Sequence, residues 1–81
     1  HMKKLLFTSI ILFSSIFTFA QSVNEYVEEG ITYHDAGRYS KAIELYKKAL
    51  ELEPNSPMVN YEISLSYFSN GDYENAIKYA D

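Results

Sequence analysis

The stretch VNEYVEEGITYHDAGRYSKAIELYKKALELEPNS, residues 23–56, decides the fold because its pattern begins again 34 residues later. When the chain is shifted by 34, tyrosines, glycines and small apolar residues fall on their own kind: Tyr33 on Tyr67, Gly37 on Gly71, Tyr39 on Tyr73, Ala42 on Ala76, and Ile43 on Ile77. A repeat of this length is typical of proteins that stack short structural units. The sequence therefore predicts an array of repeats rather than a fold closed around one core.

Each unit contains two stretches of helical periodicity separated by a glycine. The second stretch, Tyr39 to Leu52, has apolar residues at the i, i+3, i+4 and i+7 spacing of one helix face: Tyr39, Ala42, Ile43, Tyr46, Ala49 and Leu50. A first helix is predicted from Val23, because Ser22 and Glu25 have the spacing of a capping box. Gly37 is free to take the positive φ that ends a helix. The unit is therefore predicted to be a pair of antiparallel helices.

The second unit repeats these signals. Pro54 excludes the helical conformation for the residue before it, and a third helix is expected from Pro57 to about Ser69, after an N-cap at Ser56. Asp72 is expected to cap a fourth helix. That helix has four residues suited to burial: Tyr73, Ala76, Ile77 and Ala80. Nothing in the sequence is available to cover its outer face.

The unit resembles the tetratricopeptide repeat (TPR) family. The family pattern W-x2-L-G-x2-Y, A-x3-F, P corresponds, at the same spacing, to Tyr26, Glu29, Gly30, Tyr33, Ala42, Tyr46 and Pro54. The first copy departs from it at Glu29, where the family prefers Leu. The second copy has three replacements: Asn60, Ser64 and Ala80 for Tyr26, Gly30 and Tyr46.

The resemblance implies an all-α fold, in which antiparallel helix-turn-helix repeats stack as a short right-handed superhelical solenoid. It divides the chain into a first TPR at residues 23–56 and a second, truncated TPR at residues 57–81, so a longer array is expected. Gly30 and Ala42 are predicted to lie where the helices cross closely, because larger side chains would push the backbones apart.

Residues 1–20 have the layout of a secretory signal peptide. His1 is expected to come from the expression vector; Lys3 and Lys4 are basic, residues 5–19 are apolar, and cleavage is expected after Ala20. The apolar run contains five Ser or Thr and is short for a membrane span, which needs ~20 apolar residues. Export to the periplasm is therefore predicted. The alternatives are an anchor formed by an uncleaved N-terminal helix and a helix buried in the fold.

Beyond residue 20 the chain is acidic, with five Lys or Arg against eleven Asp or Glu and a net charge of −6. Such a surface repels nucleic-acid phosphates and anionic lipid. No nucleic acid is therefore expected as a partner, and no membrane once the signal is cleaved. The chain has no cysteine, which excludes disulfides, thiolate metal sites and a cysteine nucleophile.

In TPR proteins that bind peptides, the first helix of each pair lines a concave groove, and the resemblance carries this role over to five positions of each repeat. These positions are Asn24, Val27, Ile31, His34 and Asp35 in the first copy, and Met58, Tyr61, Leu65, Phe68 and Ser69 in the second. The apolar middle of this face favours a peptide with hydrophobic anchors held by burial. The alternative is that some of these residues, above all Ile31 and Leu65, belong to the core.

Two other functions are rejected. TPR proteins that clamp the carboxyl terminus of chaperone tails have Lys and Asn at positions that Val27 and Ile31 occupy in this chain. His34 beside Asp35 is interpreted as a solvated pair, because a lone histidine is a poor basis for a metal or acid–base site. No catalytic residue, cofactor or metal is predicted.

Together these features predict a non-enzymatic protein–protein interaction scaffold that binds a peptide or partner helix in an apolar concave groove. The alternative is a sensory or tethering segment of a larger membrane-anchored signalling protein. Self-association through the uncovered last helix is a further expectation if no other repeat covers it.

Overall fold

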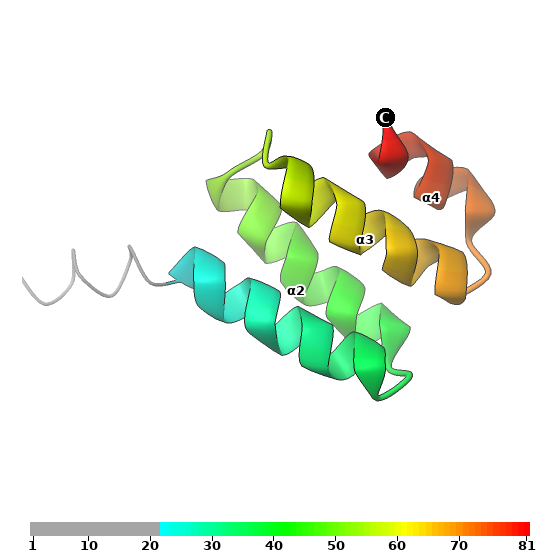
Figure 1. Cartoon of the computed structure of the whole chain (residues 1–81), viewed down its shortest axis with the longest axis horizontal. Coiled ribbons are helices and arrows are strands. Elements are labelled where there is room, and N and C mark those ends of the chain that lie inside the picture. The colour runs from blue at the N-terminus through cyan, green and yellow to red at the C-terminus, as the bar shows by residue number, and fades with distance from the viewer. Residues whose placement is uncertain (1–21) are drawn as a thin grey trace, which may run out of the picture.

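The computed structural model describes residues 22–81, and the regular structure in this range is entirely helical. It consists of a first helix at residues 22–35, followed by α2 (Tyr39–Leu52), α3 (Pro57–Ser69) and α4 (Tyr73–Ala80) (Figure 1). The predicted bounds of the second and third helices and the start of the fourth are confirmed. The predicted signal peptide at residues 1–20 lies outside the described residues. In the described range, no helix is both long and apolar enough to cross a membrane.

Side chains just before α3 and α4 cap these helices as predicted. The Ser56 hydroxyl accepts a hydrogen bond from the backbone N–H of Val59 at 3.3 Å, and the Asp72 carboxylate accepts one from the N–H of Asn75 at 3.3 Å. These bonds satisfy N–H groups that have no partner within the helix. Ser22 differs from the prediction, since it is already helical rather than the residue before the helix.

Glycine ends the first helix and α3 in the same way. Gly37 has φ +78°, and its N–H donates to the carbonyl of His34 at 2.9 Å, while the Arg38 N–H donates to the carbonyl of Tyr33 at 2.8 Å. This pair of bonds is the Schellman motif, which needs a left-handed residue. The Arg38 guanidinium also lies 5.0 Å from the centre of the Tyr33 ring. The turn at Gly71, φ +82°, repeats both backbone bonds one period later.

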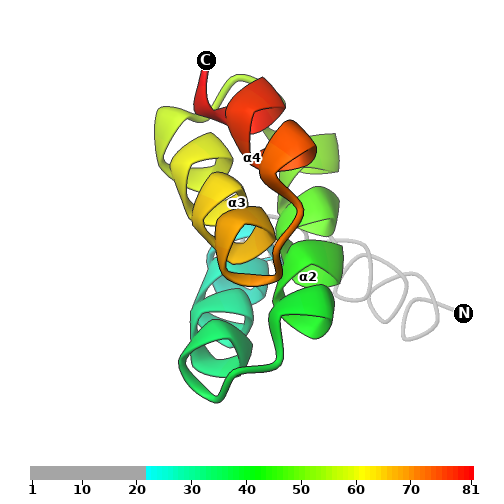
Figure 2. The same ribbon diagram turned by 90° about the vertical axis from the view of Figure 1, so that its right-hand side faces the viewer.

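The helices form two layers. Figures 1 and 2 show the first helix and α3 side by side in one layer, with α2 and α4 behind them in the other. Within this arrangement α3 packs against both α2 and α4. The predicted all-α fold of stacked antiparallel helix pairs is confirmed.

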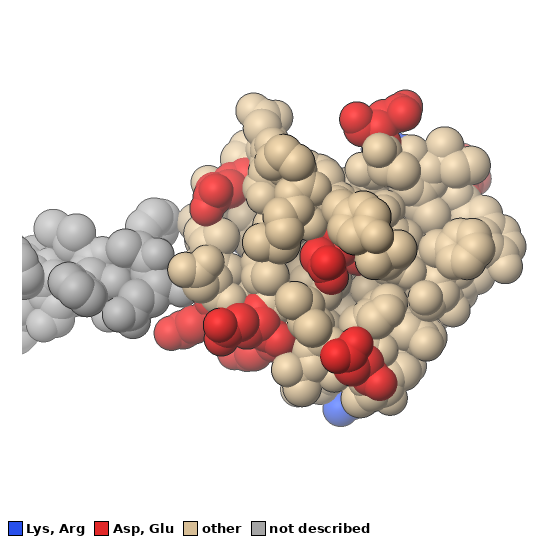
Figure 3. All heavy atoms as spheres, viewed as in Figure 1, with Lys and Arg blue, Asp and Glu red and all other residues tan. Residues whose placement is uncertain are grey.

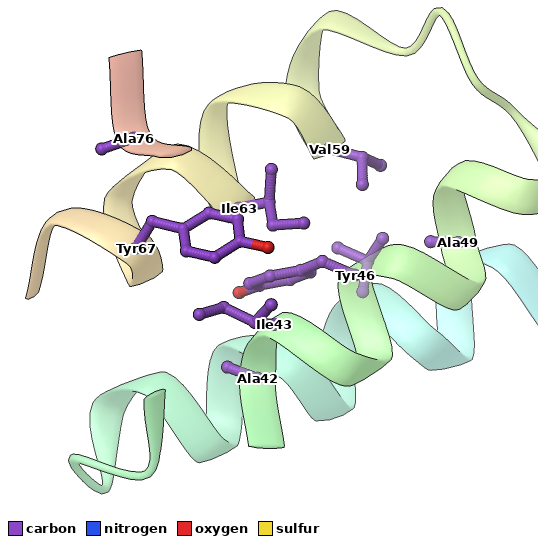
Figure 4. Close-up of a cluster of buried hydrophobic side chains, with 9 residues drawn as sticks. Ala42, Ile43, Tyr46, Ala49, Val59, Ile63, Tyr67 and Ala76 are labelled. Carbon is purple, nitrogen blue, oxygen red and sulfur yellow. The ribbon is translucent and has the colours of Figure 1, made fainter. Parts of the chain in front are cut away.

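The core lies between the layers and is centred on Tyr46 and Ile63, both fully buried. Figure 4 shows the Tyr46 ring pointing from α2 into the space bounded by Ile43, Ile63 and Tyr67. The complete cluster consists of Val27, Ala42, Ile43, Tyr46, Ala49, Val59, Ile63, Tyr67 and Ala76. Because every described helix contributes to it, each helix is held by burial of apolar surface rather than by its own hydrogen bonds.

Gly30 lies where the first helix passes closest to the Tyr46 ring. A Cβ atom at position 30 would lie 2.5 Å from Cε1 of Tyr46 and 2.9 Å from Cδ1. The predicted close crossing is confirmed, and its cause is the ring: glycine leaves the space that the ring fills. In the second pair, Ser64 stands at the position equivalent to Gly30, and Ala80 stands at the position equivalent to Tyr46.

The predicted buried face of α2 is correct at its centre and incomplete at its edges. Ala42, Ile43, Tyr46 and Ala49 are buried, whereas Tyr39 and Leu50 are half-buried. Leu45, which was not predicted to be buried, is only 6 % exposed.

The burial predicted for α4 is wrong for three of its four residues. Ala76 is buried, but Tyr73 and Ile77 are 59 % and 69 % exposed, and Ala80 is also exposed. The reason is that no described helix packs on the outer side of α4. The apolar stripe of this helix therefore forms part of the surface.

Candidate functional site

One face of α3 carries a ridge of exposed apolar side chains. Met58, Tyr61, Leu65 and Phe68 are 50 %, 60 %, 38 % and 62 % exposed, and their spacing of three or four residues aligns them along the helix. The opposite face of α3 belongs to the core. A helix with apolar side chains on two faces needs a neighbour for each, so this ridge is a surface suited to a partner. We call these four residues the α3 ridge.

The first helix lies beside this ridge and adds less apolar surface than predicted. Ile31, the equivalent of Leu65 one repeat earlier, is 38 % exposed, and Asn24 is exposed. Val27 is only 5 % exposed and packs in the core cluster, so its side chain does not face a ligand. The alternative prediction placed Ile31 and Leu65 in the core. It is wrong, because both side chains are 38 % exposed. The apolar surface is therefore centred on α3 rather than shared equally by the two helices.

His34 joins the first helix to α3. Its Nδ1 lies 2.8 Å from the hydroxyl of Ser66, which is fully buried, and its ring packs edge-on against Tyr39 with 5.0 Å between centroids. The interpretation of His34 and Asp35 as a solvated pair is therefore wrong for the histidine. The hydrogen bond to Ser66 and the ring contact give His34 a positioning role between the two helices.

The charge on this layer has one sign. The first helix contains Glu25, Glu28, Glu29 and Asp35, α3 contains Glu62, and neither helix contains Lys or Arg. Figure 3 views this layer and shows acidic patches around a broad uncharged area, with very little basic surface. Within residues 22–81, the basic residues belong to α2, α4 and the turn before α2. The apolar ridge is thus bordered by carboxylates.

The ridge continues into an apolar hollow between α3 and α4. Leu65 and Phe68 line this hollow of about 460 Å³ together with Tyr73 and Ile77. The rings of Phe68 and Tyr73 pack edge-on, 5.3 Å apart. Tyr61 lies away from it and borders a different, more polar hollow near Lys78. Tyr73 and Ile77 were predicted to be buried but are surface residues. The signal for their exposure was that nothing in the sequence was available to cover the outer face of the last helix.

A comparison with protein families gives an independent test of the fold. A family model described as TPR repeat matches residues 30–71, more than half of the chain. The chain belongs to the TPR repeat family. The match runs from the Gly30 crossing to the Gly71 turn and so includes all of α2 and α3. TPR repeats are protein–protein interaction modules, which fits the exposed α3 ridge.

Proposed function

We propose that this chain is a non-enzymatic scaffold that binds a partner protein through the α3 ridge and the neighbouring surface of the first helix. The observation that carries the proposal is the ridge itself, with four large apolar side chains 38–62 % exposed on a helix whose other face is packed. Contiguous apolar surface of this kind marks binding sites. The partner contributes a helical or extended segment with apolar anchors.

The charge of the surrounding surface suggests what flanks those anchors. Five carboxylates and no cationic side chain lie on the first helix and α3. A segment with Lys or Arg on either side of its apolar anchors complements this surface, whereas acidic flanks are repelled. Each exposed ion pair adds only ~0.2–1 kcal/mol. Burial at the ridge therefore supplies most of the affinity, and charge supplies selectivity.

A selection from a displayed peptide library tests this proposal. Fluorescence anisotropy then measures each selected peptide against the wild type, the double variant Tyr61→Glu/Leu65→Glu, and the control Ser40→Glu. The control adds a carboxylate at an exposed site of α2. We expect the double variant to bind at least tenfold more weakly, because two anchor contacts are replaced by charges, and the control to bind normally.

Circular dichroism on the same variants separates binding from folding. Both substituted ridge residues are exposed, so helicity should be unchanged. Equal affinity of the wild type and the double variant would refute the ridge as the binding surface. Selected peptides with acidic rather than basic flanks would refute the proposed selectivity.

We also propose that the chain is exported to the periplasm after cleavage behind Ala20. The proposal rests on the basic, apolar and small-residue segments of residues 1–20. The intact mass of the protein recovered from fractionated cells tests it. A mass that lacks residues 1–20 supports export with cleavage, and a full-length protein in the membrane fraction contradicts it.

A further inference from the structure

The turn between α3 and α4 contains an asparagine followed by a glycine, Asn70 and Gly71, and both residues are exposed. Asparagine is one of the thermally labile residues of proteins. The backbone nitrogen of the next residue can attack its side-chain carbonyl carbon, and this attack is easiest when that residue is glycine, because glycine has no Cβ atom to hinder the approach. The equivalent turn one repeat earlier has Ala36 before Gly37, and alanine has no side-chain amide to lose.

The other asparagines of the chain are less suited to this reaction. Three of them lie within helices: Asn24, Asn60 and Asn75. Asn55 lies in the turn before α3 and is exposed, but it precedes Ser56, whose Cβ atom hinders the attack. Asn70 is therefore the asparagine whose sequence and exposure favour the reaction most.

The folded turn opposes the reaction in two ways. The Gly71 nitrogen has to lose its proton before it attacks, but its N–H donates a hydrogen bond to the carbonyl of Phe68 at 3.0 Å. Asn70 has ψ near 0°, a conformation in which its own backbone nitrogen, rather than its Cβ atom, eclipses the Gly71 nitrogen. A five-membered ring requires the Cβ atom in that place. Ring closure therefore needs a large rotation about the Cα–C bond of Asn70.

Two contacts hold the turn in this conformation. The N–H of Asp72 donates to the carbonyl of Tyr67 at 2.9 Å, which is the second bond of the Schellman motif. The rings of Phe68 and Tyr73 pack edge-on across the turn, with 5.3 Å between their centroids, and both are more than half exposed. Such surface contacts at a helix end open locally with a smaller free energy than global unfolding requires.

From this arrangement we infer that Asn70 is a site of spontaneous deamidation and that opening of the Gly71 turn controls its rate. In the open turn, the Gly71 nitrogen forms a bond to Cγ of Asn70 and gives its proton to the side-chain amide, which leaves as ammonia. The product is a succinimide ring. Water then opens the ring at either of its two carbonyl carbons, and no oxidant or reductant is needed. One product is aspartate, and the other is isoaspartate, in which the backbone passes through the Cβ atom.

Either product changes the turn. The new carboxylate adds negative charge at the C-terminus of α3, where the helix dipole disfavours it. Arg38 and Lys41 line the same surface hollow as Asn70 and offset part of this cost. In the isoaspartate, the longer backbone also alters the spacing with which the Gly71 and Asp72 N–H groups bond to the α3 carbonyls. The modified chain therefore holds α4 against α3 less firmly.

Incubation of the full chain in mildly alkaline buffer tests this inference. Mass spectrometry of peptide digests measures the loss of the amide at position 70, and electron-transfer fragmentation distinguishes isoaspartate from aspartate. The folded chain is compared with the same chain unfolded in urea and with a synthetic peptide of residues 66–75. We expect Asn70 to react at least about tenfold more slowly in the folded chain than in the other two samples. In urea, Asn70 should react faster than Asn55.

Variants separate the reactive residue from the contacts that control it. Tyr73→Ala removes the ring contact with Phe68 and should accelerate the reaction of the folded chain about two- to tenfold. The control Met58→Ala, which removes an exposed side chain at the other end of α3, should leave the rate unchanged. Ala36→Asn places an asparagine before Gly37 and should create a second site that reacts slowly in the folded chain and fast in urea.

The urea comparison needs no variant, so it decides the inference even if Tyr73→Ala unfolds, which circular dichroism detects. An intact amide at Asn70 in the unfolded chain would overturn the site. Equal rates in the folded and unfolded chains would overturn its control by the turn. A folded Tyr73→Ala variant that reacts at the wild-type rate would overturn the role of the ring contact.

Discussion

The contact between Gly30 and Tyr46 shows how a single position couples two helices. The ring is fully buried, and the backbone of the first helix approaches it so closely that a methyl group does not fit. In the second pair, Ser64 and Ala80 occupy the equivalent positions with much less side-chain bulk, and both line open hollows. Close packing at this crossing is therefore a property of the first pair, where the Tyr46 ring fills the space beside Gly30.

We predict that Gly30→Ala destabilises the fold by about 1–3 kcal/mol, the range for overpacking a core. Alanine favours a helix by ~1 kcal/mol over glycine, so helix propensity alone predicts the opposite sign. Urea unfolding followed by circular dichroism measures the difference. The control is Ser64→Ala, where a Cβ is already accommodated, and it should change stability much less. A stabilised Gly30→Ala variant would show that the Tyr46 ring can move aside.

Tyr46 also makes the fold sensitive to alkaline pH. Burial, with a smaller contribution from Glu62, raises the pKa of the Tyr46 phenol well above its ordinary value, so the folded state keeps it protonated. In the unfolded chain a tyrosine ionises near pH 10. Above that pH the unfolded state binds fewer protons than the folded state. The free energy of unfolding must then decrease as the pH rises.

We predict a stability loss of up to ~1.4 kcal/mol per pH unit above about pH 10 from this residue. Tyr46→Phe removes that contribution, so its stability should fall less steeply than that of the wild type. At pH 7 the variant should differ by less than ~1 kcal/mol, because the hydroxyl lies 3.5 Å from the Glu62 carboxylate, a weak hydrogen bond. Urea unfolding at pH 7 to 11 tests this. If the free energy of unfolding decreases equally steeply with pH in the wild type and in Tyr46→Phe, this prediction is contradicted.

At the scale of elements, the two glycine turns end the first helix and α3. Gly37 and Gly71 both have φ near +80° with open space around the position of a Cβ. A Cβ atom added at either position contacts no neighbouring atom, so a substitution there destabilises the fold through the backbone conformation alone. Gly30 is the opposite case, since a substitution there destabilises the fold through a steric clash with the Tyr46 ring.

We predict that Gly71→Ala destabilises the fold by ~1–2 kcal/mol, the cost of the left-handed conformation for an L-residue with a Cβ. Gly71→Asn should cost less, because asparagine tolerates this region. Both variants are measured by urea unfolding, with Gly37→Ala as the equivalent substitution one repeat earlier. An equal effect of Ala and Asn would mean that the turn can change its conformation at little cost.

At the scale of the whole described molecule, the two layers differ in the sign of the charge they carry. The first helix and α3 carry only acidic charge, whereas α2 and α4 carry Lys and Glu together. The α3 ridge and the hollow between α3 and α4 share Leu65 and Phe68 at their border. The acidic surface of the first layer complements the basic flanks of the partner segment proposed above.

Helix bounds were predicted well because their signals are local. Ser56, Asp72 and the two turn glycines act on backbone groups a few residues away, and the i, i+3, i+4 spacing identifies a buried face without reference to neighbours. Exposure was predicted less well. Val27 faces the core and Ile77 faces outward although both lie on apolar stripes, and periodicity alone does not say which stripe finds a neighbour.

The amino-acid sequence alone was sufficient for the helix pairs and their 34-residue period, because both depend on short-range sterics and hydrogen bonding. The location of the closely packed glycine was predicted from its place in the repeat pattern. The packed structure was needed to show that the Tyr46 ring fills the space at Gly30 and that His34 bonds Ser66. These contacts join residues 16 and 32 positions apart, where only the relative placement of helices determines which side chains meet.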